Sequence, residues 1–189
     1  MSKEKIKIEP KDVLRIGGIL MAICASVAFI LSFVNMVTVD TIAKNDEMEK
    51  RNAIVFLFDS ETIVYDALEG TSDTVKAIYK VKDGDSLLGY CVSVASPGFG
   101  GDIDMMVALD GESKVLGVKI VSLSETPGLG SRVAGDSFLD LFKGKGTGIE
   151  LGKDVDAISG STISSRAVTA GVNAATSALN EYFGGGVNE

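Results

Sequence analysis

The sequence predicts an α+β protein in which one N-terminal transmembrane helix is followed by an extracytoplasmic domain with an antiparallel sheet and packed helices. Three observations indicate this fold class. An uncharged apolar run lies near the start of the 189-residue chain, two pairs of strand-like segments follow in its middle, and apolar residues recur with helical spacing near its end. The period of the apolar residues distinguishes helices from strands, and a chain of this length has room for one domain and an appendage.

The first element is a transmembrane helix over residues 16–39. These residues carry no charge, and as a helix they would extend about 36 Å, which is enough to cross a hydrocarbon core of about 30 Å. The alternative is a cleaved signal peptide, whose apolar region would be only about 7–15 residues long and would precede a small-x-small site. The run is longer than that and no such site follows it, so we expect a helix that stays in the membrane.

Charges on the two sides of this run predict the orientation of the chain. Residues 1–15 carry five basic and three acidic side chains, a charge of +2, whereas the residues after the run carry 13 basic and 23 acidic side chains, a charge of −10. The positive-inside tendency therefore places the N-terminus in the cytoplasm and the domain outside. An acidic domain repels phosphate backbones, so we do not expect nucleic acid as a partner. We expect a single-pass protein of the cytoplasmic membrane, in contact with lipid.

The reactive side chains limit the chemistry that the chain could perform alone. It contains no histidine, so it has no Ser-His or Cys-His nucleophile pair and no histidine-based metal site. Cys24 lies in the membrane run and Cys91 in an expected strand, so they cannot form a disulfide with each other, and neither has the paired spacing of a zinc or iron–sulfur site. We expect buried, inert thiols, and a ligand shared with another subunit is the alternative for Cys24. Asp102 and Asp104 are interpreted as solvated carboxylates rather than cation ligands. We expect no catalytic residue and no metal, and any redox chemistry must come from an imported cofactor.

Residues 40–75 are expected to form a helical stalk and a connection to the domain. The helix continues over residues 40–58, with polar residues early and an apolar patch at residues 54–58. This patch is expected to pack on the domain, and contact with a partner subunit is the alternative. The domain itself is placed at residues 76–183, followed by a flexible tail at residues 184–189.

Four segments with strand-like patterns predict an antiparallel sheet of at least four strands. They form two hairpins whose turns are Asp83-Gly84 and Asp110-Gly111, and Pro97-Gly98 separates the hairpins. The expected strands are residues 76–82, 87–95, 103–109 and 115–121.

A loop with the sequence Glu-Thr-Pro-Gly-Leu-Gly follows the sheet at residues 125–130. Pro127 and Gly128 fit positions i+1 and i+2 of a type II turn, where glycine supplies the positive φ. The loop could be only a turn, or its glycines could let backbone N–H groups approach a planar ring or a phosphate.

Residues 138–142 predict a short helix, and a basic, glycine-rich connection follows at residues 143–148. This connection is not a Walker A loop, because the spacing from Gly146 to Gly152-Lys153 is one residue too long and Asp154 follows the lysine.

The last part of the domain joins a small-residue turn to a long helix. Its apolar residues repeat with helical spacing at Val168, Val172, Ala175, Leu179 and then Tyr182 or Phe183. The first N–H groups of a helix lack partners within it and the dipole there is positive, so an anion is stabilised. A plain helix cap is the simpler interpretation of the turn. The residues that would bind a phosphate are Ser159, Gly160, Ser161 and Thr162.

Residues 156–168, which contain this turn, closely resemble the S-G-A-T flavinylation motif of the FMN-binding domain family. That family includes the G subunit of the Rnf electron-transport complex and the C subunit of the sodium-pumping NADH:quinone reductase. Residues 125–130 resemble the family's E-T-P-G-L-G loop, and the resemblance covers most of residues 12–183. In the family the threonine of the motif carries FMN through a phosphodiester bond, which places the linkage at Thr162. Ser161 stands where the family usually has alanine and becomes a competing hydroxyl.

The resemblance also implies which residues surround the flavin. Lys145 or Lys153 could screen the flavin phosphate, and Asp156 could belong to what a flavin transferase recognises. The cofactor-binding residues expected beside Thr162 are Ser159, Gly160, Ser161, Glu125, Thr126, Gly128, Leu129 and Gly130.

By this resemblance the chain is a membrane-anchored flavoprotein subunit that relays electrons within an Rnf-type, ion-translocating ferredoxin:NAD oxidoreductase complex. Its partners would be the other membrane subunits of the complex and a separate flavin transferase that loads it from FAD. An electron-carrying subunit of this kind is not catalytically complete when isolated. The alternatives are a subunit of a sodium-pumping NADH:quinone reductase, a free-standing extracytoplasmic flavinylated reductase and a non-redox, membrane-anchored scaffold.

Overall fold

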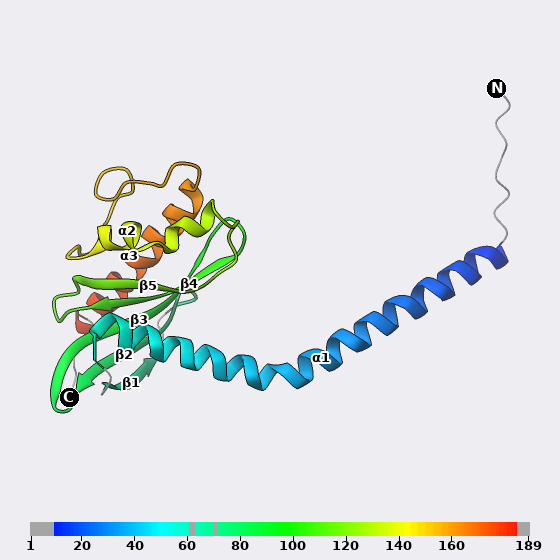
Figure 1. Cartoon of the computed structure of the whole chain (residues 1–189), viewed down its shortest axis with the longest axis horizontal. Coiled ribbons are helices and arrows are strands. Elements are labelled where there is room, and N and C mark those ends of the chain that lie inside the picture. The colour runs from blue at the N-terminus through cyan, green and yellow to red at the C-terminus, as the bar shows by residue number, and fades with distance from the viewer. Residues whose placement is uncertain (1–9, 61–62, 70–71, 185–189) are drawn as a thin grey trace, which may run out of the picture. The chain divides into compact units, whose positions relative to one another are not determined.

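The computed structural model describes residues 10–60, 63–69 and 72–184, and the chain divides into two units, residues 1–47 and residues 48–189. Helix α1, Pro10–Phe58, begins in the first unit and ends in the second (Figure 1).

The first unit contains the apolar part of α1. Residues Val13–Val39 form one helical stretch that is long and apolar enough to cross a membrane, and none of it is buried inside the protein. Two of its hydroxyl groups donate within the helix: that of Ser26 to the Ala22 carbonyl at 2.7 Å and that of Thr38 to the Val34 carbonyl at 2.9 Å. Such internal hydrogen bonds matter where no water is at hand. The predicted apolar helix at residues 16–39 is confirmed as a helix.

The second unit is built on a five-stranded antiparallel sheet whose order in space follows the chain, β1-β2-β3-β4-β5 (Figure 1). The four expected strands are confirmed, and β1 adds a fifth at the edge. Strand β1 lies within the range 40–75, which was assigned to the stalk and connection, and it pairs with β2 from Ile63↔Asp83 to Glu69↔Ala77. The strands are β1 Ile63–Glu69, β2 Val75–Asp83, β3 Ser86–Pro97, β4 Asp102–Leu109 and β5 Val115–Leu123.

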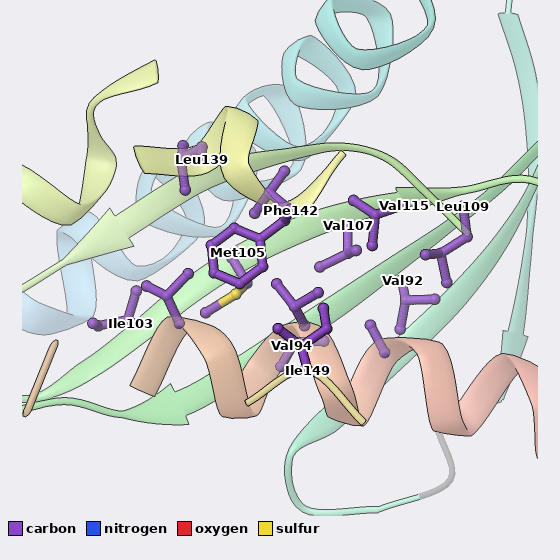
Figure 2. Close-up of a cluster of buried hydrophobic side chains, with 14 of the residues drawn as sticks. Val92, Val94, Ile103, Met105, Val107, Leu109, Val115, Leu139, Phe142 and Ile149 are labelled. Atoms are coloured by element: carbon purple, nitrogen blue, oxygen red, sulfur yellow. The ribbon is translucent and has the colours of Figure 1, made fainter. Parts of the chain in front are cut away.

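Helices cover one face of this sheet. The long helix α3, Thr162–Gly184, packs there together with the short helix α2, Asp136–Leu139, and two 3₁₀ turns, η1 Gly130–Ala134 and η2 Asp140–Phe142. Figure 2 shows the core between them, with side chains of β3 and β4 directed toward the helices. Buried residues of this core include Val92, Val94, Ile103, Met105, Val107, Leu109, Phe142, Val168, Val172 and Leu179.

The other face of the sheet is covered by the last turns of α1. Successive residues of a strand point to opposite faces, so Cys91 and Met106 turn away from the helical core and pack with Ala53 and Ile54 of α1. Leu57 and Phe58 pack against the same cluster, which confirms the expectation that residues 54–58 pack on the domain. Burial raises the pKa of the Cys91 thiol above its usual range, so the thiol stays protonated and unreactive.

Candidate functional site

The loop at residues 125–130 forms the predicted turn. The Leu129 N–H donates to the Thr126 carbonyl at 3.1 Å, and Gly128 has a φ of 74°. A proline at the second position and a positive φ at the third are the features of a type II turn. The Gly128 N–H donates to the Ser131 hydroxyl at 2.9 Å, which attaches the turn to the start of η1.

The turn before α3 is also closed by hydrogen bonds. The Ser161 N–H donates to the Ile158 carbonyl at 2.9 Å, and the Ser161 carbonyl accepts from the Ser165 N–H at 2.9 Å. Ser161 is therefore the residue at the N-cap position, directly before the first residue of α3. The Ser165 hydroxyl accepts from the Ile158 N–H at 3.1 Å, and Gly160 adopts a φ of 81° that favours glycine. Residues 158–165 thus form a folded helix start rather than a loose linker.

These two segments, far apart in the sequence, line one pocket of about 310 Å³. Seven of the nine predicted cofactor-binding residues lie in its wall, whereas Gly128 and Ser159 do not. Phe99, Ile163 and Ser164 also line the pocket and were not predicted. The seven predicted residues in the wall are Glu125, Thr126, Leu129, Gly130, Gly160, Ser161 and Thr162.

Glu125 joins the pocket wall to the turn between β3 and β4. Its side chain is 8% exposed, and its Oε1 accepts a hydrogen bond from the Phe99 N–H at 2.7 Å. Glycines surround the carboxylate: a Cβ on Gly130 would lie 2.5 Å from Oε2, and a Cβ on Gly98 would overlap Oε1. The glycines therefore make room for the carboxylate, and the carboxylate in turn fixes the backbone that presents Phe99.

The hydroxyl groups in the pocket differ in exposure. Thr162, the first residue of α3, is exposed. Ser161 is 4% exposed and its Oγ donates to the Leu129 carbonyl at 2.7 Å, and Ser164 is buried as well. Among the hydroxyl groups of the helix start that line the pocket, Thr162 is thus the one that a reagent in solvent can reach.

The basic side chains lie unevenly around the turn. Nη1 of Arg132, in η1, is 3.5 Å from the Ser159 carbonyl oxygen. The ammonium group of Lys153 instead pairs with Glu150 at 3.1 Å on the exposed surface, and Lys145 lines a separate pocket with Asp154. Of the basic residues considered, Arg132 is the one that contacts residues 159–162, and sequence reasoning had not selected it.

No cluster of three or more His, Cys, Asp or Glu side chains that could hold a metal ion occurs within the described residues. The pocket is lined by an exposed hydroxyl, the start of a long helix with its first N–H groups, and three exposed apolar side chains. Those apolar residues are Phe99, Leu129 and Ile163, which are 71%, 47% and 51% exposed. Hydroxyl and N–H groups suit a phosphate, and exposed apolar side chains suit a planar ring.

Comparisons with known proteins fit this set of groups. A family model described as an FMN-binding domain matches residues 98–177, a range that includes both walls of the pocket. The G subunit of the Na⁺-translocating ferredoxin:NAD⁺ oxidoreductase complex of Acetobacterium woodii is 29% identical over 194 residues, covering 91% of this chain and 94% of that protein. The G subunit of the proton-translocating ferredoxin:NAD⁺ oxidoreductase complex of Clostridium ljungdahlii is 29% identical over 192 residues, covering 98% and 100%.

A solved structure is also similar in part. The crystal structure of Shewanella oneidensis NqrC matches with a TM-score of 0.44 and 27% sequence identity, over 51% of this chain and 53% of that one.

Proposed function

Because a family model described as an FMN-binding domain matches residues 98–177, we propose that this chain belongs to that family and is the membrane-anchored, FMN-carrying subunit of an Rnf-type ferredoxin:NAD oxidoreductase complex. In this role it relays electrons between the other membrane subunits while the complex moves an ion. The two G subunits from Acetobacterium woodii and Clostridium ljungdahlii match 91% and 98% of this chain. The observation that carries the proposal is the single pocket lined by both residues 125–130 and the turn before α3.

The residues of the pocket fit FMN. The first N–H groups of α3 have no partners within the helix, and the positive end of the helix dipole lies there, so a phosphate group is stabilised. Phe99, Leu129 and Ile163 line the same pocket and would contact the apolar ring system. Arg132 adds a positive charge beside the turn. When bound, FMN supplies the electron-transfer chemistry, and the protein sets its position and its access to solvent.

We propose that FMN is attached to Thr162 through a phosphodiester bond. The exposure of this hydroxyl supports the choice, because Ser161 and Ser164 are buried. The Thr162 Oγ1 would form a bond to the flavin-side phosphorus of FAD while the phosphoanhydride bond breaks, the hydroxyl proton leaves and AMP departs. The chain has no histidine to act as a base, so a separate flavin transferase would perform this reaction. Asp156, exposed just before the turn, would belong to the surface that the transferase recognises.

We also propose that the chain is located in the cytoplasmic membrane. Helix α1 would anchor the chain in the cytoplasmic membrane as a single span, and the five basic residues before that span favour a cytoplasmic N-terminus. The FMN domain would then lie outside the cytoplasm.

The attachment is tested by intact-mass measurement of the full-length chain, produced together with a flavin transferase. The wild type should carry the added mass of one FMN, and Thr162→Ala should lose it completely. Thr162→Ser, which keeps a hydroxyl at the same position, is the matched control and should retain FMN. A wild type without FMN would refute the flavoprotein assignment, and FMN on Thr162→Ala would move the linkage to another residue.

The role in a complex is tested by purification from the native membrane. The chain should bring other redox subunits with it in detergent, and a chain that comes out alone would favour a free-standing flavinylated reductase. A colourless chain with no bound flavin would favour a membrane-anchored scaffold.

A further inference from the structure

Hydrogen bonds hold together two segments that line the same pocket. The Ser161 hydroxyl donates to the Leu129 carbonyl at 2.7 Å, and the two residues are 32 positions apart in the sequence. The serine side chain is almost fully buried, so solvent competes little with this bond. On the exposed side, Arg132 approaches the Ser159 carbonyl oxygen at 3.5 Å. We call the Ser161–Leu129 hydrogen bond the loop clasp.

The backbone is shaped for this close approach. Gly160 has a positive φ, and a Cβ built there would lie 3.1 Å from Cδ1 of Leu129. The leucine side chain thus rests against the glycine, and the neighbouring serine reaches the leucine carbonyl. Because Leu129, Gly160 and Ser161 all line the pocket, the clasp fixes the distance between its two walls.

The clasp can be removed without leaving a buried group unsatisfied. The Leu129 carbonyl also accepts a hydrogen bond from the Arg132 N–H at 3.2 Å, so it keeps a partner when the serine hydroxyl is absent. An orphaned buried carbonyl would be costly, whereas the loss of one of two hydrogen bonds is a modest change. Ser161→Ala should therefore fold.

We propose that Ser161 is a positioning residue, whose hydroxyl holds residues 125–130 against the start of α3 and keeps the flavin docked in the pocket. The part of this inference that concerns the flavin rests on the proposed function, whereas the clasp itself does not. A cofactor linked only through its phosphate can swing about that link. The wall that contains Leu129 limits this motion as long as the loop stays in place.

The clasp is tested first in the absence of flavin, by amide hydrogen exchange in the full-length Thr162→Ala chain. The N–H groups of Leu129 and Ser131 both donate to the Thr126 carbonyl, so their exchange reports opening of the loop. Adding Ser161→Ala should speed their exchange about fivefold, as expected for the loss of one intramolecular hydrogen bond. Ser137→Ala, at an exposed serine of α2, is the matched control and should leave these rates unchanged. Unchanged rates in the Ser161→Ala chain would overturn the clasp.

The positioning role is tested in the loaded chain. Ser161→Ala should carry the same FMN mass as the wild type, but its flavin fluorescence anisotropy should fall and its midpoint potential should shift, because the ring spends more time in solvent. If Ser161→Ala speeds amide exchange but leaves the flavin anisotropy and midpoint potential unchanged, the clasp stabilises the loop without positioning the flavin. That result would overturn the positioning role. A wild type without FMN would overturn both the proposed function and the proposal that Ser161 positions the flavin. The amide exchange rates would still show whether the loop clasp forms.

Discussion

Glycines next to Glu125 show how single residues shape the pocket. The carboxylate is buried between the turn at residues 98–101 and Gly130, and it accepts a hydrogen bond from the Phe99 backbone. A buried carboxylate needs such donors, because its desolvation is otherwise costly. Gly100, next to Phe99, lies so close to the β5 end of the sheet that a Cβ there would overlap the Ser124 carbonyl oxygen. This arrangement depends on the absence of side chains at several neighbouring positions.

Gly100→Ala should lower the free energy of unfolding by about 1–3 kcal/mol, because the new methyl group meets a backbone atom that cannot rotate away. The measurement is thermal or denaturant unfolding of the full-length chain in detergent, followed by far-UV circular dichroism. Gly146→Ala is the control, since a Cβ at Gly146 meets nothing within 4 Å, and its effect should stay within about 0.5 kcal/mol. Equal stability of the two variants would mean that the turn is not as close to Ser124 as described.

At the scale of elements, α3 connects the pocket to the rest of the core. Its first residue is Thr162, and further along it buries Val168, Val172 and Leu179 against the sheet. It also holds the preceding loop, because the Asn173 side chain accepts from the Ile149 N–H and donates to the Ile149 carbonyl, both at 2.8 Å. The helix thus holds Ile149, in the segment that leads into the turn at residues 158–161. Because this turn lines the pocket, we expect the packing of α3 in the core to keep the pocket in shape.

Asn173→Ala should destabilise the domain by about 1–3 kcal/mol, because the N–H and the carbonyl of Ile149 both lose their partner. Asn180→Ala on the same helix is the matched control, since Asn180 is exposed, and it should change the free energy of unfolding little. Denaturant unfolding of both full-length variants in detergent measures these changes in the free energy of unfolding. A loss for Asn173→Ala no greater than that for Asn180→Ala would contradict the anchoring role.

At the scale of the whole molecule, the chain consists of two units with different surroundings. Residues Val13–Val39 expose apolar side chains along the entire stretch, which suits lipid and not water. The second unit has its own core on both faces of the sheet. The residues before the span are net positive and those after it net negative, so the orientation proposed above has a physical basis in the positive-inside tendency.

The orientation is tested by labelling single cysteines in right-side-out membrane vesicles. Cys24 and Cys91 are first replaced by alanine, and one cysteine is then introduced at Ser86, exposed at the start of β3, or at Ser2. A membrane-impermeant maleimide should label the Ser86→Cys chain at once and the Ser2→Cys chain only after the vesicles are opened. The reverse pattern would place the FMN domain in the cytoplasm and contradict the proposed electron-transfer topology.

The elements of the fold were largely predictable from the sequence. The uncharged run, the alternating segments of both hairpins and the helical spacing of Val168, Val172 and Leu179 all predicted elements that the structure confirms. Strand β1 was missed, because it is an edge strand that is specified by pairing with β2 rather than by a clear pattern of its own. Elements with a strong local period depend on residues that are neighbours in sequence, so they can be read without tertiary structure.

The candidate site was only partly predictable. Residues 125–130 and 159–162 were selected by their resemblance to family motifs, and seven of those residues share one pocket. Tertiary structure alone revealed that Phe99 joins them, that the Ser161 hydroxyl is occupied by Leu129 and that Arg132 approaches Ser159. Such contacts join positions 26–32 residues apart. They depend on how loops pack on the sheet and on α3, and a local pattern of residues carries no information about that packing.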